Sequence, residues 1–429
     1  MKKLVTLLFL LLILLLGGCS QSLYTQGRKL VAQEQYRSAV DLFYEELKLH
    51  PDNSQAWREL GFAYYKNGNL VKAEDALQQA GAIRWDARTH LYLGFVYEKT
   101  SDVGKALDAY GAALTLSPQG RTHTIINSRI LALKRKQIEI EARRVIANER
   151  SIDTDTIPSN TVAVVSFDGS RLSLSMQPIA LGLAEFVAAD LAKVASLTVV
   201  ERMQVEAVLK ELKLGESGNL DPSSAPKAGR LFGSRRVITG SVWELGESSM
   251  RLDGAIVDVV DSATTVTDAT EGAMKRVFEV EKEFVFQILD SLGIKLTDAE
   301  RRAIREVPTD SYLAFLAYSR GLSFVDNGMY VEAQEQFGEA IAHDPGFGEA
   351  QVELQTLNST DPTLIDAPLD QFVDIAGGAM GGGDGDGGSG QDLSTIAVNN
   401  GFTGTGADQS PDEPPLSRGS VSVKVSFDD

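Results

Sequence analysis

The chain has 429 residues, 43% of them hydrophobic, with a formal net charge of −18 and a single cysteine. This length allows roughly two to four domains with real apolar cores. The acidic balance argues against nucleic acid as a main partner, because phosphate binding needs concentrated Lys and Arg, and against docking on anionic lipid by charge alone. One cysteine excludes an intrachain disulfide.

The N-terminus has the pattern of a bacterial lipoprotein signal. Two lysines precede an apolar run of 13 residues, 4–16, which spans about 20 Å as a helix, short of a ~30 Å hydrocarbon core. Small residues then lead to Cys19. We predict that residues 1–18 are a signal peptide and that the Cys19 thiol carries a covalent diacylglycerol membrane anchor, with no other cofactor. Ser20 favours the outer membrane, facing the periplasm; the alternative is an uncleaved membrane anchor.

Residues 20–118 contain an internal repeat of 33–34 residues. The in-phase glycines are Gly27, Gly61 and Gly94. Residues 57–64 have the W-x-x-L-G-x-x-Y spacing of the tetratricopeptide (TPR) repeat, in which small residues sit where two helices cross and aromatic residues fill the space beside them. We therefore predict three TPR repeats. Residues 119–152 are predicted to continue as one long, basic helix and linker.

The first helices of stacked TPR repeats form a concave face. In this register the face includes Tyr24, Arg28, Arg58, Phe62, Tyr65, Lys66, Phe95 and Lys99. Aromatic side chains supply contact area and Arg or Lys binds carboxylates, so we predict a groove for an acidic or extended peptide of a protein partner. For each single residue, the alternative is a packing or solvated role.

Residues 161–293 have the pattern of an α/β domain. β-branched runs predict strands at 161–168, 197–201, 237–245, 250–260 and 263–270. Apolar residues at three- and four-residue spacing predict helices at 178–194, 202–214, 223–232 and 277–292. A helix joins the first two strands, which predicts a parallel pair, and turns join the last three, which predicts an antiparallel meander.

Six segments of this domain, in this order, resemble the CsgG family of curli-secretion and related envelope lipoproteins. The segments are 162–167, 183–191, 199–202, 229–233, 238–242 and 257–261. The resemblance implies a small mixed-sheet domain that forms a homo-oligomer. In CsgG two long membrane hairpins interrupt the meander, and an aromatic- and amide-bearing loop forms the pore constriction. The matching turns here, 246–249 and 261–262, are too short for such strands, and loop 169–177 has no aromatic residue, so we do not expect the channel.

The C-terminal part contains a further repeat and a biased tail. Thr297 and Glu300 have the spacing of a capping box, which predicts a short helix, and residues up to 357 continue as a fourth TPR repeat. A lone repeat cannot bury its own faces, so it must pack on the central domain, on the first repeats or on another subunit. From about residue 358 to 429 the composition is acidic and rich in glycine, which predicts disorder.

The predicted fold class is α+β multidomain: an all-α TPR solenoid, a mixed-sheet CsgG-like α/β domain, a single TPR hairpin and a disordered tail. No catalytic residues, metal ligands or phosphate loop assemble from the sequence, so we predict that the protein is not an enzyme. We expect a periplasm-facing, outer-membrane lipoprotein that binds protein partners for an envelope or secretion structure, such as curli-like fibres, a flagellar or pilus apparatus, or exported polysaccharide. A CsgG-type channel subunit and an activator of a peptidoglycan synthase are the alternatives.

Overall fold

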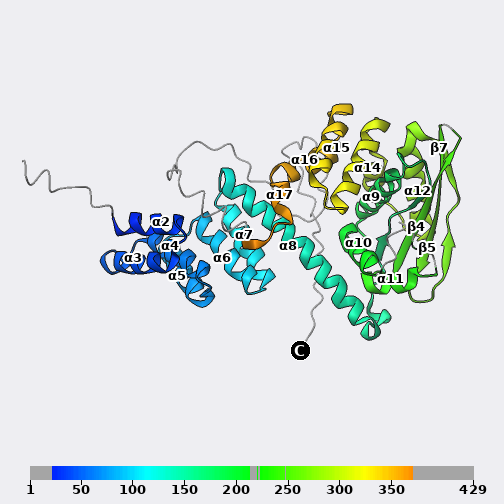
Figure 1. The fold of residues 1–429 in the computed structure, drawn as a ribbon. Coiled ribbons are helices and arrows are strands. Elements are labelled where there is room, and N and C mark those ends of the chain that lie inside the picture. The colour runs from blue at the N-terminus through cyan, green and yellow to red at the C-terminus, as the bar shows by residue number, and fades with distance from the viewer. Residues whose placement is uncertain (1–21, 213–219, 221–222, 247, 371–429) are drawn as a thin grey trace, which may run out of the picture. The chain divides into compact units, whose positions relative to one another are not determined.

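The computed structural model describes residues 22–212, 220, 223–246 and 248–370. The described residues divide into two compact units, one made of residues up to Leu133 together with 359–370 and the other of residues 134–358. Figure 1 labels the helices and strands of both units. The predicted signal peptide, Cys19 and the tail beyond residue 370 lie outside the described residues.

Helical hairpins form the first unit. Its helices are α2 (Leu23–Ala32), α3 (Tyr36–Leu49), α4 (Ser54–Lys66), α5 (Leu70–Ile83), α6 (Ala87–Lys99) and α7 (Val103–Thr115). A Cβ atom at Gly27 would lie 2.7 Å from the Phe43 ring, and one at Gly94 would lie 2.2 Å from the Tyr110 ring. Because no side chain fits at these crossings, glycine lets the paired helices approach and the rings become fully buried. The predicted TPR-like helical region is confirmed.

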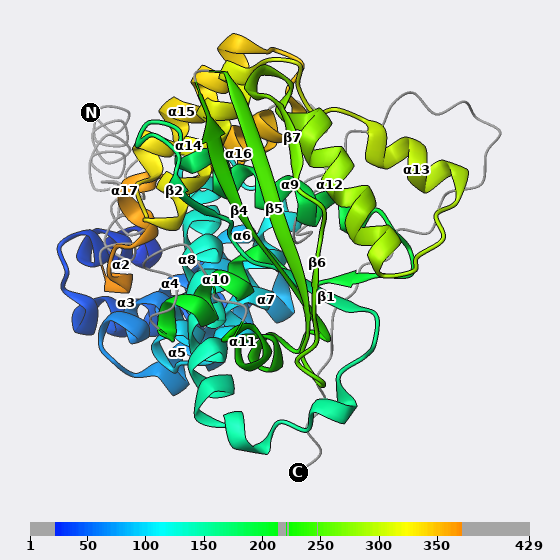
Figure 2. The same ribbon diagram turned by 90° about the vertical axis from the view of Figure 1, so that its right-hand side faces the viewer.

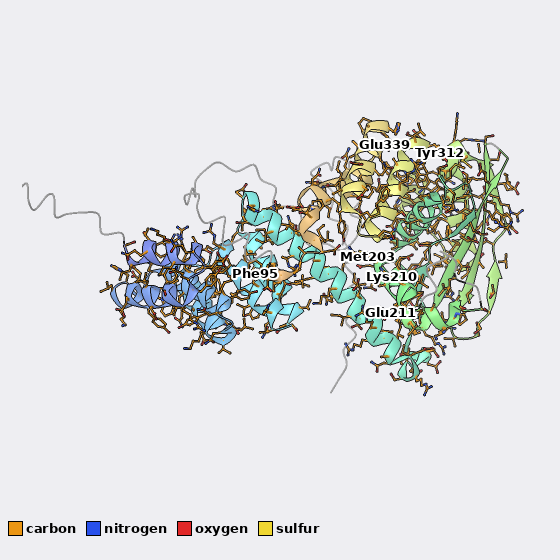
Figure 3. All side chains as sticks on the ribbon, viewed as in Figure 1. Phe95, Met203, Lys210, Glu211, Tyr312 and Glu339 are labelled. Atoms are coloured by element: carbon orange, nitrogen blue, oxygen red, sulfur yellow. The ribbon has the colours of Figure 1, made fainter. Side chains whose placement is uncertain are left out.

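A single long helix, α8 (Gly120–Ala147), begins in the first unit and ends in the second. Its N-terminal part joins the apolar core of the repeats through Leu133, and its C-terminal part joins a separate small cluster through Ala142. There Arg143 Nε lies 3.3 Å from the Glu211 carboxylate, labelled in Figure 3. Two 3-10 turns follow the helix, Glu149–Ser151 and Thr154–Thr156.

The second unit contains a mixed sheet. Its strands are β1 (Thr161–Val164), β2 (Asp168–Arg171), β3 (Thr198–Val199), β4 (Arg236–Leu245), β5 (Ser249–Asp258), β6 (Thr264–Val266) and β7 (Thr270–Ala273). The strand order is β3-β1-β4-β5-β6, with β2 paired to β4 and β7 paired to β5. The pairs β1–β3 and β1–β4 are parallel, and β5 is antiparallel to β4, β6 and β7. The predicted mixed sheet is therefore confirmed.

Two details of the strands differ from the sequence-based prediction. The stretch expected to be a loop after the first strand contains β2, which pairs with β4. The single strand expected at 263–270 is divided into β6 and β7. The break lies at Thr267, which is buried and whose N–H and hydroxyl both donate to the carbonyl of Gly254, at 2.9 and 3.1 Å. These two bonds replace regular ladder pairing, so the chain changes register against β5 at this residue.

Helices cover both faces of the sheet. They are α9 (Pro178–Ala192), α10 (Arg202–Glu211), α11 (Ala225–Phe232) and α12 (Val277–Ser291). A Cβ at Gly254 of β5 would meet the Phe284 ring of α12 at 2.3 Å, whereas a Cβ at Gly229 of α11 would meet Val259 just beyond β5 at 2.3 Å. Positions 254 and 259 differ by an odd number, so they face opposite sides of the sheet. Figure 2 shows the long pair β4–β5 among these helices.

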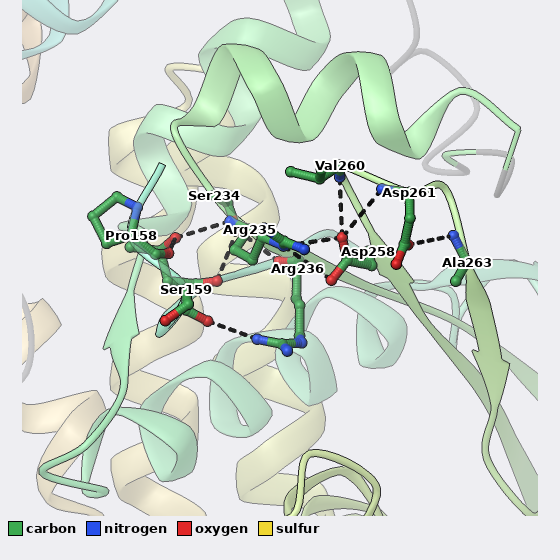
Figure 4. A network of polar contacts seen from close by, with 10 residues as sticks. Pro158, Ser159, Ser234, Arg235, Arg236, Asp258, Val260, Asp261 and Ala263 are labelled. Carbon is green, nitrogen blue, oxygen red and sulfur yellow. Dashed lines mark hydrogen bonds and ion pairs between the residues drawn. The ribbon is translucent and has the colours of Figure 1, made fainter. Parts of the chain in front are cut away.

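A polar network closes the end of the sheet where β4 begins (Figure 4). Arg235 Nε donates to the Asp258 carboxylate at 3.0 Å, and the guanidinium of Arg236 donates to the Ser159 carbonyl at 2.6 Å. Asp258 also accepts from the N–H of Val260 at 3.0 Å. The bonds connect the linker before β1, the start of β4 and the turn after β5, so one edge of the domain is fixed by side-chain contacts to the backbone.

The fourth repeat packs on the central domain. Its helices are α14 (Tyr312–Asp326), α15 (Tyr330–His343) and α16 (Gly348–Asn358), preceded by α13 (Asp298–Arg305) with the predicted Thr297–Glu300 capping box. A Cβ at Gly182 of α9 would lie 2.1 Å from Ser319 Oγ of α14, so the two helices are in direct contact. The Phe186 ring of α9 lies 5.9 Å from Phe315 and 5.6 Å from Tyr318 between ring centroids. Three alternative packing partners were predicted for this repeat, and in the structure it packs on one of them, the central domain.

Candidate functional site

The candidate site is the surface built by α2, α4, α6 and the N-terminal part of α8, which we call the repeat face. Lys99 is exposed there, and Tyr24, Arg28 and Lys66 are half-buried. The guanidinium of Arg28 lies over the Tyr24 ring at 5.8 Å, and the Lys66 ammonium lies over the Tyr36 ring at 5.2 Å. These four predicted residues are thus open to solvent, at least in part, and two of them are positioned by aromatic rings.

The other four predicted residues are buried, so their assignment to an open groove needs correction. They are Arg58, Phe62, Tyr65 and Phe95, with exposed fractions between 0% and 6%. Phe62 stacks on Tyr92 with ring centroids 4.6 Å apart, and Phe95 lies 6.3 Å from Tyr65 (Figure 3 labels Phe95). Large aromatic rings fill the space between the first helices of neighbouring repeats. The aromatic residues that were predicted to line a groove therefore pack between repeats instead.

Arg58 is held by carboxylates of its own unit. Its guanidinium lies 2.5 Å from Asp86 and 3.0 Å from Glu59. Burial would raise the pKa of Asp86, but the Arg58 charge and hydrogen bonds from Thr89 outweigh it and lower that pKa. Asp86 is also the N-cap of α6, where its Oδ1 accepts from the N–H of Thr89 at 2.7 Å. Arg58 therefore connects two repeats and is not positioned to bind a partner's carboxylate.

The structure shows a peptide-like segment on the repeat face. Residues 359–370 were predicted to be disordered, but they contain a short helix, α17 (Pro362–Ile365), and pack on the first unit (Figure 1). Leu364 is 4% exposed and belongs to the apolar core of the repeats, with Ala367 and Leu369 packed against that core. The prediction missed this segment because its four apolar residues (Leu364, Ile365, Ala367 and Leu369) show no regular helical or strand period.

Arg129 is the central polar residue of this site. Its Nε donates to Glu98 Oε1 at 2.9 Å, a second nitrogen bonds Glu98 Oε2, and Nη1 donates to the Ala367 carbonyl at 3.2 Å. Burial lowers the pKa of Arg129, but the bonds to Glu98 outweigh it and raise that pKa. The guanidinium is thus fixed by one carboxylate and turns its remaining donor to the segment.

Sequence reasoning missed Arg129, although the repeat period points to it. Phe95 lies 33 residues after Phe62, and Arg129 lies 34 residues after Phe95, so the three residues occupy one position of successive repeats. The N-terminal part of α8 therefore continues the series of first helices. Extension of the period beyond Pro118 would have placed Arg129 on the repeat face.

Further polar contacts hold the two ends of the segment. Asn127 donates to the Ser359 carbonyl at 3.2 Å, and Ser128 Oγ accepts from the N–H of Asp361 at 2.9 Å. At the other end, Lys99 Nζ lies 3.2 Å from the carboxylate of Asp370. Lys99 is thus a predicted groove residue that contacts a carboxylate of this segment.

The second unit contains half-buried charges with a structural role. Arg202 of α10 pairs with Glu185 at 2.7 Å and with Asp326 at 2.7 Å, which connects α10 to α9 and α14. Burial and the nearby Glu185 raise the pKa of Glu353 to about 7. Within the described ranges, no group of three or more His, Cys, Asp or Glu side chains is placed to hold a metal ion. Among those same residues, no helix has both the length and the apolar character needed to cross a bilayer.

Two protein families match parts of the chain. The family described as curli production assembly/transport component CsgG matches residues 136–270, and the tetratricopeptide repeat family matches residues 24–87. The first match begins inside α8 and ends at the start of β7; the second covers the first two hairpins and the start of the third. No curated protein matches the chain.

Solved structures with TPR repeats are similar at low level. The TPR2AB domain of yeast Sti1 in complex with pHSP90 has 12% identity and a TM-score of 0.29, covering 80% of this chain and 99% of that chain. A TPR protein from Parabacteroides merdae has 12% identity and a TM-score of 0.25, covering 79% of this chain and 98% of that chain. Scores this low do not establish a shared overall fold.

Proposed function

Because this chain is a CsgG-family protein with TPR repeats, we propose that it is a non-enzymatic assembly factor of the bacterial envelope. The TPR repeats point to protein–protein interaction and the CsgG domain to a curli-related role at the outer membrane. In this proposal Cys19 anchors the protein to the outer membrane by its lipid, and the repeat face binds a protein partner in the periplasm. The CsgG domain docks or oligomerises during assembly or secretion of an envelope structure.

The observation that carries the proposal is the segment on the repeat face. Residues 359–370 are held there by an aliphatic side chain, by donors to backbone carbonyls and by a lysine–carboxylate pair. Backbone donors and an apolar anchor are the means by which protein surfaces bind peptides of partner proteins. A face that binds one segment of chain in this way has the chemistry to bind another.

The fourth repeat supports a division of roles between the units. Its helix α14 packs on α9, where Gly182 meets Ser319 and Phe186 meets the rings of Phe315 and Tyr318. The fourth repeat therefore stabilises the central domain, and partner binding falls to the first three repeats. In this proposal the central domain with its attached repeat is the part that docks or forms a homo-oligomer.

Photo-crosslinking in cells tests partner binding. A photoreactive amino acid is placed at Lys66 or Lys99 on the repeat face, and at exposed Gln79 of α5 as the matched control. We expect both face positions, and not the control, to crosslink the same envelope or secreted protein. Equal crosslinking at all three positions would contradict a specific face.

Membrane association is tested with Cys19→Ser. We expect the wild-type chain in the outer-membrane fraction and the variant to be lost from that fraction, because the uncleaved variant keeps its apolar N-terminal run, with the lipid of the wild type seen by mass spectrometry of its N-terminal peptide. An unmodified Cys19 would contradict the anchor. Native mass spectrometry of the extracted protein, with a vesicle leakage assay on the same sample, tests the CsgG domain: a ring that leaks solute would replace this proposal by the channel alternative.

A further inference from the structure

We infer that residues 359–370 occupy, in cis, a peptide site formed by α6 and α8 on the repeat face. We infer also that the partner segment that takes this site has the same chemistry: an aliphatic anchor followed by a carboxylate. The inference rests on the proposed function, since it names the kind of segment that the repeat face binds. It adds that the chain's own segment competes with the partner.

The apolar anchor is the first element of the site. Leu364 and Ile365 are buried, with 4% and 1% of their surfaces exposed, whereas the neighbouring residues Thr363 and Asp366 are exposed. The short helix α17 turns both aliphatic side chains away from solvent, and Leu364 enters the apolar core of the repeats. The segment therefore needs aliphatic side chains at two adjacent positions, whereas the exposed residues on either side of them are free to vary.

Backbone recognition is the second element. Arg129 donates to the Ala367 carbonyl, Asn127 donates to the Ser359 carbonyl, and Ser128 accepts from a backbone N–H. Contacts of this kind carry no information about side chains, so they bind any segment with a similar backbone path. Arg129 is well suited to this role because its pair with Glu98 removes the freedom of the guanidinium before the segment binds.

Charge is the third element. The Lys99 side chain pairs with Asp370, and both are largely exposed, at 48% and 72%. An exposed pair contributes little affinity, but it sets the direction in which the segment lies and disfavours a basic residue there. The segment 361–370 contains three aspartates and no lysine or arginine. We therefore assign the partner as an acidic segment with an aliphatic anchor.

The contacts fit an occupant that can leave. Three side chains of residues 359–370 are buried, those of Thr360, Leu364 and Ile365, and Ala367 and Leu369 add partly buried apolar contact. The rest of the attachment is a few hydrogen bonds and one exposed ion pair. Attachment through the chain itself gives such a segment a high local concentration, so weak contacts are enough to keep it bound. An external segment must then compete, and its apparent affinity falls by the fraction of molecules in which the site is open.

The test uses the full chain and a fluorescent synthetic peptide with the sequence of residues 359–370. Anisotropy titration compares the wild-type chain with Leu364→Ser, which undocks the cis segment. We expect the variant to bind the peptide at least about tenfold more tightly than wild type, and a peptide carrying the same serine not to bind. In the Leu364→Ser chain, Lys99→Glu is expected to weaken binding about threefold, whereas Arg84→Glu, an exposed residue after α5, is the matched control without effect.

A second experiment does not disturb the core. Cysteines replace Lys99 and Asp370 in a Cys19→Ser chain, and a short bismaleimide joins them. Both sites are exposed, so folding is retained, and we expect crosslinking to lower peptide binding at least about tenfold relative to the unlinked chain. Equal binding before and after crosslinking would overturn cis occupancy. A folded Leu364→Ser chain that does not bind the peptide would show that the segment is a permanent cap of the repeats.

The outcomes separate this inference from the proposed function. If the undocked chain binds the peptide but no envelope protein crosslinks to the repeat face, the proposed function fails and the peptide site remains. If a partner crosslinks to the face and the peptide does not compete with it, the proposed function stands and the inference about its chemistry fails.

Discussion

Replacement of Glu281 by Gln is expected to stabilise the second unit at neutral and alkaline pH. The Glu281 side chain on α12 is fully buried, and its Oε2 lies 3.1 Å from Lys282 Nζ. That ammonium lies closer, at 2.6 Å, to Asp190, which also pairs with Lys193 at 2.8 Å. Burial and the Asp190 charge raise the pKa of Glu281 to about 8, because Lys282 is shared by two carboxylates.

The sign of the effect follows from proton binding. The folded unit keeps a proton on Glu281 that the unfolded chain loses near its ordinary pKa of 4.5. The raised pKa therefore gives stability that is fully present below pH 4.5 and is lost as the pH rises toward 8. The loss is at most about 1.4 kcal/mol per pH unit, or about 4 kcal/mol from pH 5 to pH 8. Glutamine binds no proton in this range, so Glu281→Gln avoids the loss.

Urea unfolding followed by tryptophan fluorescence measures this difference. The chain has three tryptophans, and changing Trp57 and Trp85 to Phe leaves Trp243 on β4 as the reporter of the second unit. We expect the unfolding free energy of Glu281→Gln to match that of the parent near pH 5 and to exceed it by about 2–4 kcal/mol at pH 8. The raised pKa of Glu353 acts in both proteins and cancels in the comparison.

A difference between parent and variant that stays constant from pH 5 to pH 8 would refute the reasoning, because it would mean that Glu281 is ionised throughout. The matched control is Glu283→Gln, which removes a carboxylate from the exposed side of the same helix. We expect that control to change the free energy of unfolding little at any of these pH values.

Other predictions concern the packing of the second unit. Gly182→Ala is expected to cost about 1–3 kcal/mol in thermal unfolding because its Cβ would meet Ser319 Oγ at 2.1 Å; Gly338→Ala on α15, where nothing lies within 4 Å, is expected to be neutral or stabilising, and equal effects would contradict this view of the contact. Arg202→Leu is expected to cost about 1–3 kcal/mol in urea unfolding, because it leaves Glu185 and Asp326, whose side chains are 12% and 30% exposed, without a cation, and a cost below about 0.5 kcal/mol would mean that solvent screens the cluster. Thr297→Ala removes the capping box of α13 and is expected to cost about 1 kcal/mol, with Thr297→Ser restoring most of it.

The repeats and the order of the main strands follow from local patterns. A TPR hairpin needs a small residue opposite a large one at each helix crossing. The pairs Gly27–Phe43 and Gly94–Tyr110 therefore recur with a period that is visible in the sequence alone. Likewise, β5 contains alternating buried and half-exposed residues, and the short turn that joins it to β4 allows only antiparallel pairing. These signals depend on residues close together in sequence.

Other features depended on contacts between distant residues. The division of one expected strand into β6 and β7 results from two bonds between Thr267 and the Gly254 carbonyl, 13 residues earlier. The same aromatic and basic residue types suit an open groove and a packed interior, so only the structure separated buried Arg58 from exposed Lys99.

By itself, the sequence determined that this protein has TPR repeats, a CsgG-type mixed sheet and a further repeat in need of a packing partner. Only the tertiary structure decided that this partner is α9 and that residues 359–370 lie on the repeat face. The physical reason is that the local sequence pattern around Gly182 and Leu364 does not indicate which distant surface each residue packs on. Their burial comes from surfaces that are more than 100 residues away along the chain, such as Ser319 for Gly182 and Arg129 for the segment around Leu364.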